Sequence, residues 1–158
     1  MNKFKGVLVD SNLLLLLFVG LYDSRTIARV GRLRNVYDSL DFKVLFEKYI
    51  SPNDCYYTLR ILAEVYSLSK SADGDMQPFI VSSVCRAIAE FEEIGITSSD
   101  CCAYDGINRF GFTDVEIIKV ARDNDLLVIT DDLKLQAELF RNTIDCLNMR
   151  QIRNPHLK

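Results

Sequence analysis

The stretch LLVITDD, residues 126–132, is a near-continuous apolar segment that ends in two acids. Its short length and its aliphatic, β-branched content predict a buried strand over 126–130. Residues 113–124 before it and 132–141 after it have helical patterns, and 143–147 has the pattern of a further strand. Strands that alternate with helices predict a parallel sheet covered by helices on both faces.

The helix before this strand is predicted to begin within the sequence Thr113-Asp114-Val115-Glu116. The pattern is typical of a capping box, in which the Thr113 hydroxyl and the Glu116 carboxylate satisfy exposed amides at a helix start. Asp114 is therefore expected in the first turn of this helix.

The N-terminal segment also combines a strand, an acid and a helix. Residues 5–9 predict a short buried strand, Asp10 follows it directly, and the apolar run 13–19 predicts a buried helix. This run is far shorter than the roughly 20 residues needed to cross a bilayer, so we expect neither secretion nor a membrane partner. The five cysteines are odd in number and form no CxxC pair, which favours a reduced, cytoplasmic protein.

The rest of the chain has no recognisable linker, repeat or low-complexity tract. A helix opening at Thr58 is predicted to turn Leu59, Leu62, Ala63 and Tyr66 toward the core. The other predicted elements are helices at 24–35, 42–49, 77–93 and 99–109, strands at 55–57 and 94–97, and a turn at 51–53. We therefore expect one α/β domain over 1–158, with a doubly wound, mainly parallel sheet.

Acidic residues from four parts of the chain are expected at one edge of this sheet. Ligands of open α/β sheets bind outside the carboxyl ends of the strands. The acids concerned are Asp10, Glu64, Asp114 and the Asp131–Asp132 pair. Several carboxylates in one pocket need a cation or must in part protonate, and oxygen ligands select Mg²⁺ or Mn²⁺ over zinc. A metal in such a site is suited to activating water for attack on a phosphodiester. The only histidine, His156, lies near the C-terminus, so we expect no histidine to act as general base there.

Each acid also has a purely structural interpretation. Asp114 suits a helix N-terminus, Asp131 or Asp132 could cap the next helix, and Glu64 could face solvent. Asp10 is harder to explain in this way, because a charge between two apolar segments is costly without a partner. The net charge of −3 is not that of a typical nucleic-acid binder.

Four segments, in order, resemble the motifs of the PIN-domain family. They are VLVDSNLL at 7–14, TLRILAEV at 58–65, GFTDVEII at 111–118 and LVITDD at 127–132. The resemblance extends over nearly the whole chain. It implies a doubly wound sheet and a metal-dependent nuclease acting in most cases on RNA.

The resemblance carries metal ligation and catalysis onto Asp10, Glu64, Asp114 and Asp132, with Asp131 as the alternative fourth ligand. It also gives Ser11, Asn12 and Thr130 supporting roles, because such side chains orient ligating carboxylates through hydrogen bonds. Residues 22–57 form a longer, helical elaboration than in compact toxin-type members. Arg25, Arg29 and Arg32 lie in it at helical spacing, either as phosphate contacts or as a solvated helix face.

Several alternatives remain open at this point. The alternative functions are a catalytically idle PIN-like interaction module and a DNA-directed nuclease of the same fold. The possible protein partners are an inhibitory antitoxin-like protein and a second copy of the chain in a homodimer. A haloacid-dehalogenase-type phosphatase would need Asp where Asn12 stands and a lysine ahead of the final acids. The sequence also lacks the lysine pattern of a phospho-receiver domain and the glycine loop of a Rossmann cofactor domain.

Overall fold

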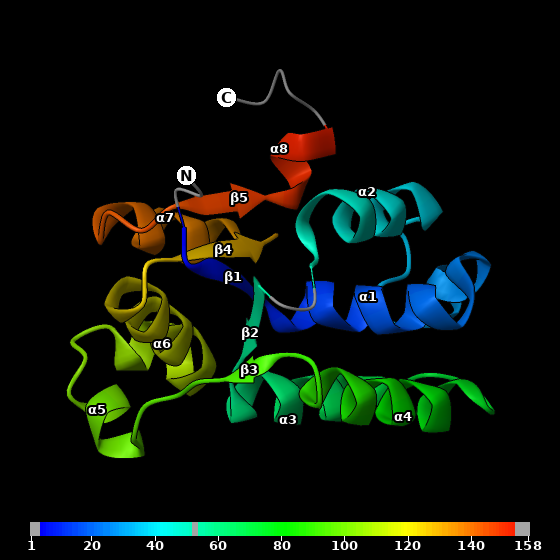
Figure 1. Ribbon diagram of the computed structural model, residues 1–158, viewed down its shortest axis with the longest axis horizontal. Coiled ribbons are helices and arrows are strands. Elements are labelled where there is room, and N and C mark those ends of the chain that lie inside the picture. The colour runs from blue at the N-terminus through cyan, green and yellow to red at the C-terminus, as the bar shows by residue number, and fades with distance from the viewer. Residues whose placement is uncertain (1–3, 52–53, 154–158) are drawn as a thin grey trace.

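A computed structural model describes residues 4–51 and 54–153, with a five-stranded, all-parallel sheet at its centre (Figure 1). The strand order is β3-β2-β1-β4-β5. The strands are β1 (Gly6–Val9), β2 (Cys55–Tyr57), β3 (Glu92–Glu93), β4 (Leu126–Thr130) and β5 (Cys146–Asn148).

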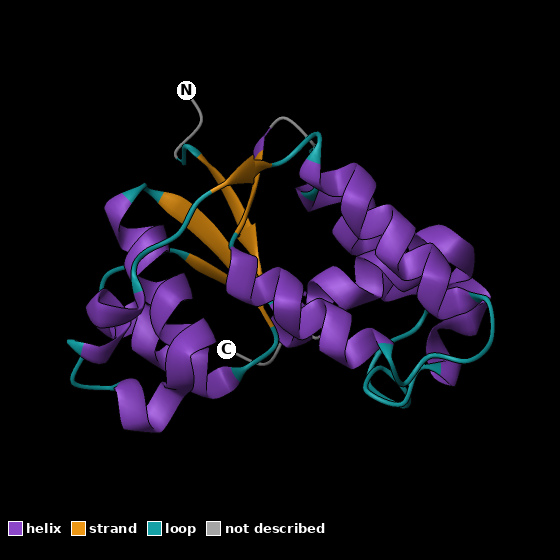
Figure 2. Cartoon of the chain, turned by 90° about the horizontal axis from the view of Figure 1, so that it is seen from below, coloured by secondary structure: helices purple, strands orange, loops and turns teal. Residues whose placement is uncertain are grey.

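Helices flank the sheet on both sides and complete the predicted three-layer α/β/α fold (Figure 2). Those from the first half of the chain gather on one side: α1 (Ser11–Asp23), the 3₁₀ helix η1 (Ser24–Arg29), α2 (Ser39–Tyr49), α3 (Leu59–Ser69) and α4 (Met76–Ile88). The later helices are α5 (Ser98–Cys102), α6 (Ile107–Asp123), α7 (Leu133–Arg141) and α8 (Met149–Arg153), of which α5, α6 and α7 lie on the other side.

The neighbouring strands β1 and β4 define the edge at which the acids meet. Their register runs from Gly6 opposite Leu126 to Val9 opposite Ile129, and the Asp10 amide still donates to the Ile129 carbonyl at 2.9 Å. From β1 the chain continues to β2 on one side, while β4 and β5 lie on the other. This change of direction is the topological switch point, outside which α/β sheets place their ligand crevice.

Helix α1 is the centre of the helical half. Leu13 to Val19 are all buried, and the helix packs against η1, α2, α3 and α4, as expected for a helix that is apolar on every side. Gly20 lets α2 approach, because a Cβ there would collide with the Phe42 ring. Within the described ranges, no helix is long and apolar enough to cross a membrane.

Residues 22–57, expected as a helical elaboration, contain η1, α2 and β2. The helix predicted over 24–35 is wrong in its length and its cap, since only a 3₁₀ helix over Ser24–Arg29 forms. The Asp23 side chain caps it, and the chain then turns through Asn35 at a φ of 60°. The turn predicted at 51–53 includes Pro52 and Asn53, which lie outside the described residues.

Five further local predictions are wrong. The helices predicted over 77–93 and 99–109 end earlier, at Ile88 and Cys102. The buried face of α3 consists of Ile61, Leu62, Val65 and Ser69. Of the residues predicted to face the core, only Leu62 does so, and Leu59, Ala63 and Tyr66 are exposed. The strand predicted at 94–97 is replaced by the shorter β3 before it and by a connection to α5. Glu116 forms no capping box at Thr113, because its carboxylate accepts hydrogen bonds from Arg60 and from the Ile96 amide.

Candidate functional site

Asp10 lies between the end of β1 and the first turn of α1, where it is the N-cap residue. Its Oδ1 accepts from the Ser11 amide at 2.6 Å, and its Oδ2 accepts from the Thr130 hydroxyl at 2.6 Å. The Thr130 side chain is fully buried at the end of β4. The Ser11 amide at the start of α1 and the Thr130 hydroxyl at the end of β4 therefore fix the orientation of one carboxylate.

The Asp10 carboxylate is poorly solvated, with only 7% of the residue exposed. Burial, together with the charges of Asp131 and Glu64, raises its pKa to about 6, against the lowering effect of the Thr130 and Ser11 hydrogen bonds. The charged form of Asp10 is therefore disfavoured by its surroundings.

Glu64 reaches the same place from α3. The helix starts at Thr58, whose hydroxyl accepts from the Ile61 amide at 3.2 Å, and it presents Glu64 on its exposed side. The Ser11 hydroxyl donates to Glu64 Oε2 at 3.0 Å. Ser11 thus binds Asp10 through its amide and Glu64 through its side chain, which links the first and second predicted motifs.

Asp114 follows a break in α6. Gly111 has φ 80° and ψ 179°, a combination that glycine tolerates far better than other residues, and the helix resumes after it. Burial is again the largest cause that raises the pKa of Asp114, here to about 7, followed by the charges of Asp10, Asp132 and Glu64. Lys134 acts in the opposite direction.

The two adjacent acids after β4 differ in their contacts. Asp132 caps α7 by accepting from the Lys134 and Leu135 amides at 2.6 and 3.1 Å, and its own amide donates to the Thr130 hydroxyl at 3.0 Å. Asp131 is buried beside Tyr37. Asp132 therefore has the capping role considered from the sequence, and its charge still acts on Asp114.

Tyr37 is a component of the site region that the sequence did not indicate. Burial raises the pKa of its phenol, and Asp131 and then Asp10 raise it further. Tyr37 precedes α2 and belongs to the region expected as a helical elaboration. Residues 22–57 therefore reach the side of Asp131, although no local sequence pattern indicated this contact.

The three arginines considered as phosphate contacts have different surroundings. Arg25 pairs with Asp23 at 2.9 Å, and Arg29 pairs with Asp73 at 3.8 Å. Both follow the C-terminal end of α1, and a helix of that length separates them from Asp10 by about 20 Å. Arg32 is different, because its Nε donates to Asn12 Oδ1 at 2.9 Å, next to the Asp10–Ser11 turn. His156 and Lys158 lie outside the described residues.

Asp10, Glu64, Asp114, Asp131 and Asp132 thus form one electrostatically coupled cluster, hereafter the acidic cluster. Its donors are all carboxylate oxygens, which suit Mg²⁺ or Mn²⁺. Across residues 4–51 and 54–153, however, no three His, Cys, Asp or Glu side chains are already arranged to hold a metal ion. Because like charges repel, these carboxylates would have to rotate toward one another before they could share a cation.

A scan of protein-family models and a search of curated proteins gave no match to this chain.

Proposed function

We propose that the protein is a metal-dependent nuclease of the PIN type that hydrolyses phosphodiester bonds, with RNA as its substrate. The observation that carries the proposal is the convergence of Asp10, Glu64 and Asp114 at the switch point. Two of these carboxyls, Asp10 and Asp114, have pKa values raised toward neutrality by burial and by neighbouring carboxylates. A divalent cation would offset this unfavourable concentration of negative charge.

In this proposal, Asp10, Glu64, Asp114 and Asp132 hold Mg²⁺ or Mn²⁺, with Asp131 as the alternative to Asp132. Ser11 and Thr130 orient Asp10 through their hydrogen bonds, and Ser11 also orients Glu64. When bound, the cation supplies an activated water and neutralises charge that develops on the phosphate. Arg32, held by Asn12 beside the cluster, is the best placed of the three arginines to contact a phosphate.

The four motifs support the assignment to the PIN-domain family, because the key acid of each motif belongs to the acidic cluster. The proposal also assigns the protein to the cytoplasm. Its support is chemical, since Cys55, Cys85, Cys101, Cys102 and Cys146 are all free thiols, as is usual in a reducing compartment.

The test is cleavage of a labelled single-stranded RNA with Mn²⁺, compared between the native protein and Asp10→Asn. We expect Asp10→Asn to abolish cleavage, since it removes a buried anionic ligand and preserves side-chain shape. Asp73→Asn is the matched control, because Asp73 is exposed and pairs with Arg29, and it should cleave like the native protein.

Equal cleavage by the native protein and by Asp10→Asn would point to a contaminant and overturn the assignment. A DNA strand of the same sequence, run in parallel, separates the proposed ribonuclease from a DNA-directed nuclease. If the native protein cleaves neither strand with Mn²⁺ or Mg²⁺, the catalytically idle interaction module becomes the better interpretation.

A further inference from the structure

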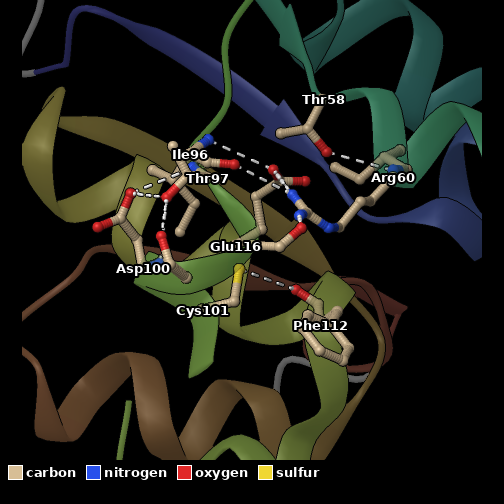
Figure 3. Close-up of polar contacts among 11 residues, drawn as sticks. Thr58, Arg60, Ile96, Thr97, Asp100, Cys101, Phe112 and Glu116 are labelled. Carbon is tan, nitrogen blue, oxygen red and sulfur yellow. Dashed lines mark hydrogen bonds and ion pairs between the residues drawn. The ribbon is translucent and has the colours of Figure 1, made fainter. Parts of the chain in front are cut away.

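Arg60 and Glu116 form a largely buried ion pair on the two helices that carry Glu64 and Asp114 (Figure 3). Arg60 lies one helical turn before Glu64 on α3, and Glu116 lies two residues after Asp114 on α6. Neither residue belongs to the acidic cluster, and neither was indicated by the sequence as a site residue.

The Arg60 side chain connects three segments of the chain. Its Nη1 donates to Glu116 Oε1 on α6 and to the Ile96 carbonyl at 3.3 Å, and its Nη2 donates to the Ser98 hydroxyl at 2.8 Å. The Ile96 amide donates to the same Glu116 oxygen at 3.4 Å. One guanidinium thereby holds α3, the connection after β3 and α6 in a fixed relation (Figure 3).

The burial of Glu116 costs free energy, so a contribution to stability alone does not explain the ion pair. Glu116 is 2% exposed, and its Oε2 has no hydrogen-bond partner among the described residues. Buried ion pairs are often no more stabilising than apolar residues of similar volume, and some are retained because they impose one particular arrangement. The position of Glu116 therefore calls for a geometric explanation.

The break at Gly111 supplies a reason for a geometric anchor. Because the backbone is not helical at Gly111, the turn that carries Asp114 does not inherit its position from residues 107–110. The buried Val115 and Ile117 anchor this restart of α6 in the core. Its polar contacts from the side are a long one from Cys101 Sγ to the Phe112 carbonyl, at 4.0 Å, and those of Glu116.

We propose that Arg60 and Glu116 are positioning residues, which set the spacing between α3 and α6 so that Glu64 and Asp114 reach the same divalent cation. This inference rests on the proposed function. It assigns the pair no contact with the cation or with the substrate. The pair acts only through the helices that present the two carboxylates.

The test measures Mn²⁺ binding to the protein without RNA, from the electron paramagnetic resonance signal of free Mn²⁺. We expect Arg60→Ala and Glu116→Ala to raise the Mn²⁺ dissociation constant by about 10-fold or more, as is typical when a residue that supports metal ligands is lost. Glu116→Gln should bind within about 3-fold of the native protein, because its amide oxygen can still accept from Arg60 and from Ile96.

A general loss of stability must be separated from a positioning role. Leu45→Ala provides the control, because Leu45 is a fully buried residue of α2 and its truncation destabilises the core without touching α3 or α6 directly. It should bind Mn²⁺ like the native protein. If Arg60→Ala does not fold, the comparison of Glu116→Ala with Glu116→Gln decides the question.

The outcomes distinguish this inference from the proposed function. If Asp10→Asn loses Mn²⁺ binding while Arg60→Ala and Glu116→Ala bind like Leu45→Ala, the positioning role is overturned and the metal site stands. A Glu116→Gln variant as weak as Glu116→Ala also overturns it, because charge and not position would then matter. If the native protein and Asp10→Asn bind Mn²⁺ equally poorly, the proposed function fails and the inference fails with it.

Discussion

The carboxylates of Glu116 and Asp10 are both buried, yet their surroundings treat them in opposite ways. Glu116 lies against the guanidinium of Arg60 and accepts a backbone amide as well. Asp10 lies beside Asp131 and Glu64, with neutral hydrogen-bond donors from Ser11 and Thr130. The charge of Glu116 is therefore compensated inside the fold, and the charge of Asp10 is not.

The same contrast applies along α6, over a distance of two residues. Burial and the neighbouring acids raise the pKa of Asp114, whereas Glu116 is paired with the Arg60 guanidinium from α3. A fold that needs rigidity at one carboxylate and charge at the next can achieve both by turning successive side chains to different partners. The comparison teaches that burial alone does not distinguish these carboxylates, and that the sign of the neighbouring charges does.

The largest expected effect on stability comes from removing the Arg60 guanidinium, which compensates the charge of Glu116. Arg60→Ala leaves Glu116 buried without its partner, and breaking a buried pair in this way costs several kcal/mol. Because Arg60 is 25% exposed and water could partly replace it, we expect a loss of about 3 kcal/mol of unfolding free energy. Urea denaturation at pH 7.5 measures it. A loss below about 1 kcal/mol would mean that the pair behaves like a surface pair.

The second prediction concerns pH, and it follows from the uncompensated acids. Asp10 and Asp114 have folded-state pKa values of about 6 and about 7, above the value of about 4 expected in the unfolded chain. The folded state therefore binds more protons across this window, so stability must fall as pH rises.

Because Asp114 is only half-buried, solvent screens part of its shift. For the metal-free protein we therefore expect a decrease of about 2 to 3 kcal/mol between pH 5 and pH 8. Thermal or urea unfolding in a chelator-containing buffer measures it. Millimolar Mn²⁺ should restore stability at pH 8, since a ligand that binds only the folded state stabilises it. A stability that rises with pH over this range would contradict the description of Asp10 and Asp114.

The third prediction is a gain in stability, opposite in sign to the loss expected for Arg60→Ala. Asp10→Asn removes a poorly solvated charge and keeps an oxygen that can accept from the Ser11 amide. At pH 8 without metal we expect the variant to be more stable than the native protein, by about 2 kcal/mol. Asp73→Asn, at an exposed position, should change stability little. A destabilised Asp10→Asn variant would show that the carboxylate is already compensated in the folded protein.

The elements that carry the acidic cluster could be predicted because their signals are local. The apolar segments ending at Asp10 and at Asp131 predict strands, and the carboxyl ends of parallel strands meet at one edge. Thr58 could likewise be identified as the start of the helix that carries Glu64. In each case a few consecutive residues contain both the element and its boundary.

The roles of Glu116 and Tyr37 could not be predicted, because their partners are distant in the sequence. Thr113 and Glu116 match a capping box, but Arg60, 56 positions away, wins the carboxylate. Tyr37 reaches Asp131 only after η1 and the following turns have brought it back. The buried face of α3 was misassigned for a related reason, since α3 packs against α1, α4 and α6 and its orientation depends on all three.

The smallest expected effect tests whether burial is what distinguishes the Arg60–Glu116 pair. Arg141 and Glu138 form an ion pair on α7 at 3.1 Å, but the Arg141 side chain is 63% exposed. Glu138 also accepts from Tyr104 at 2.6 Å, so Arg141→Ala does not leave its carboxylate without a partner. Exposed pairs contribute little, and we expect a change of about 0.5 kcal/mol or less in the urea experiment used for Arg60→Ala. If the two arginine variants instead lose similar stability, the cost lies in removing any arginine, and the contrast between compensated and uncompensated carboxylates loses its energetic basis.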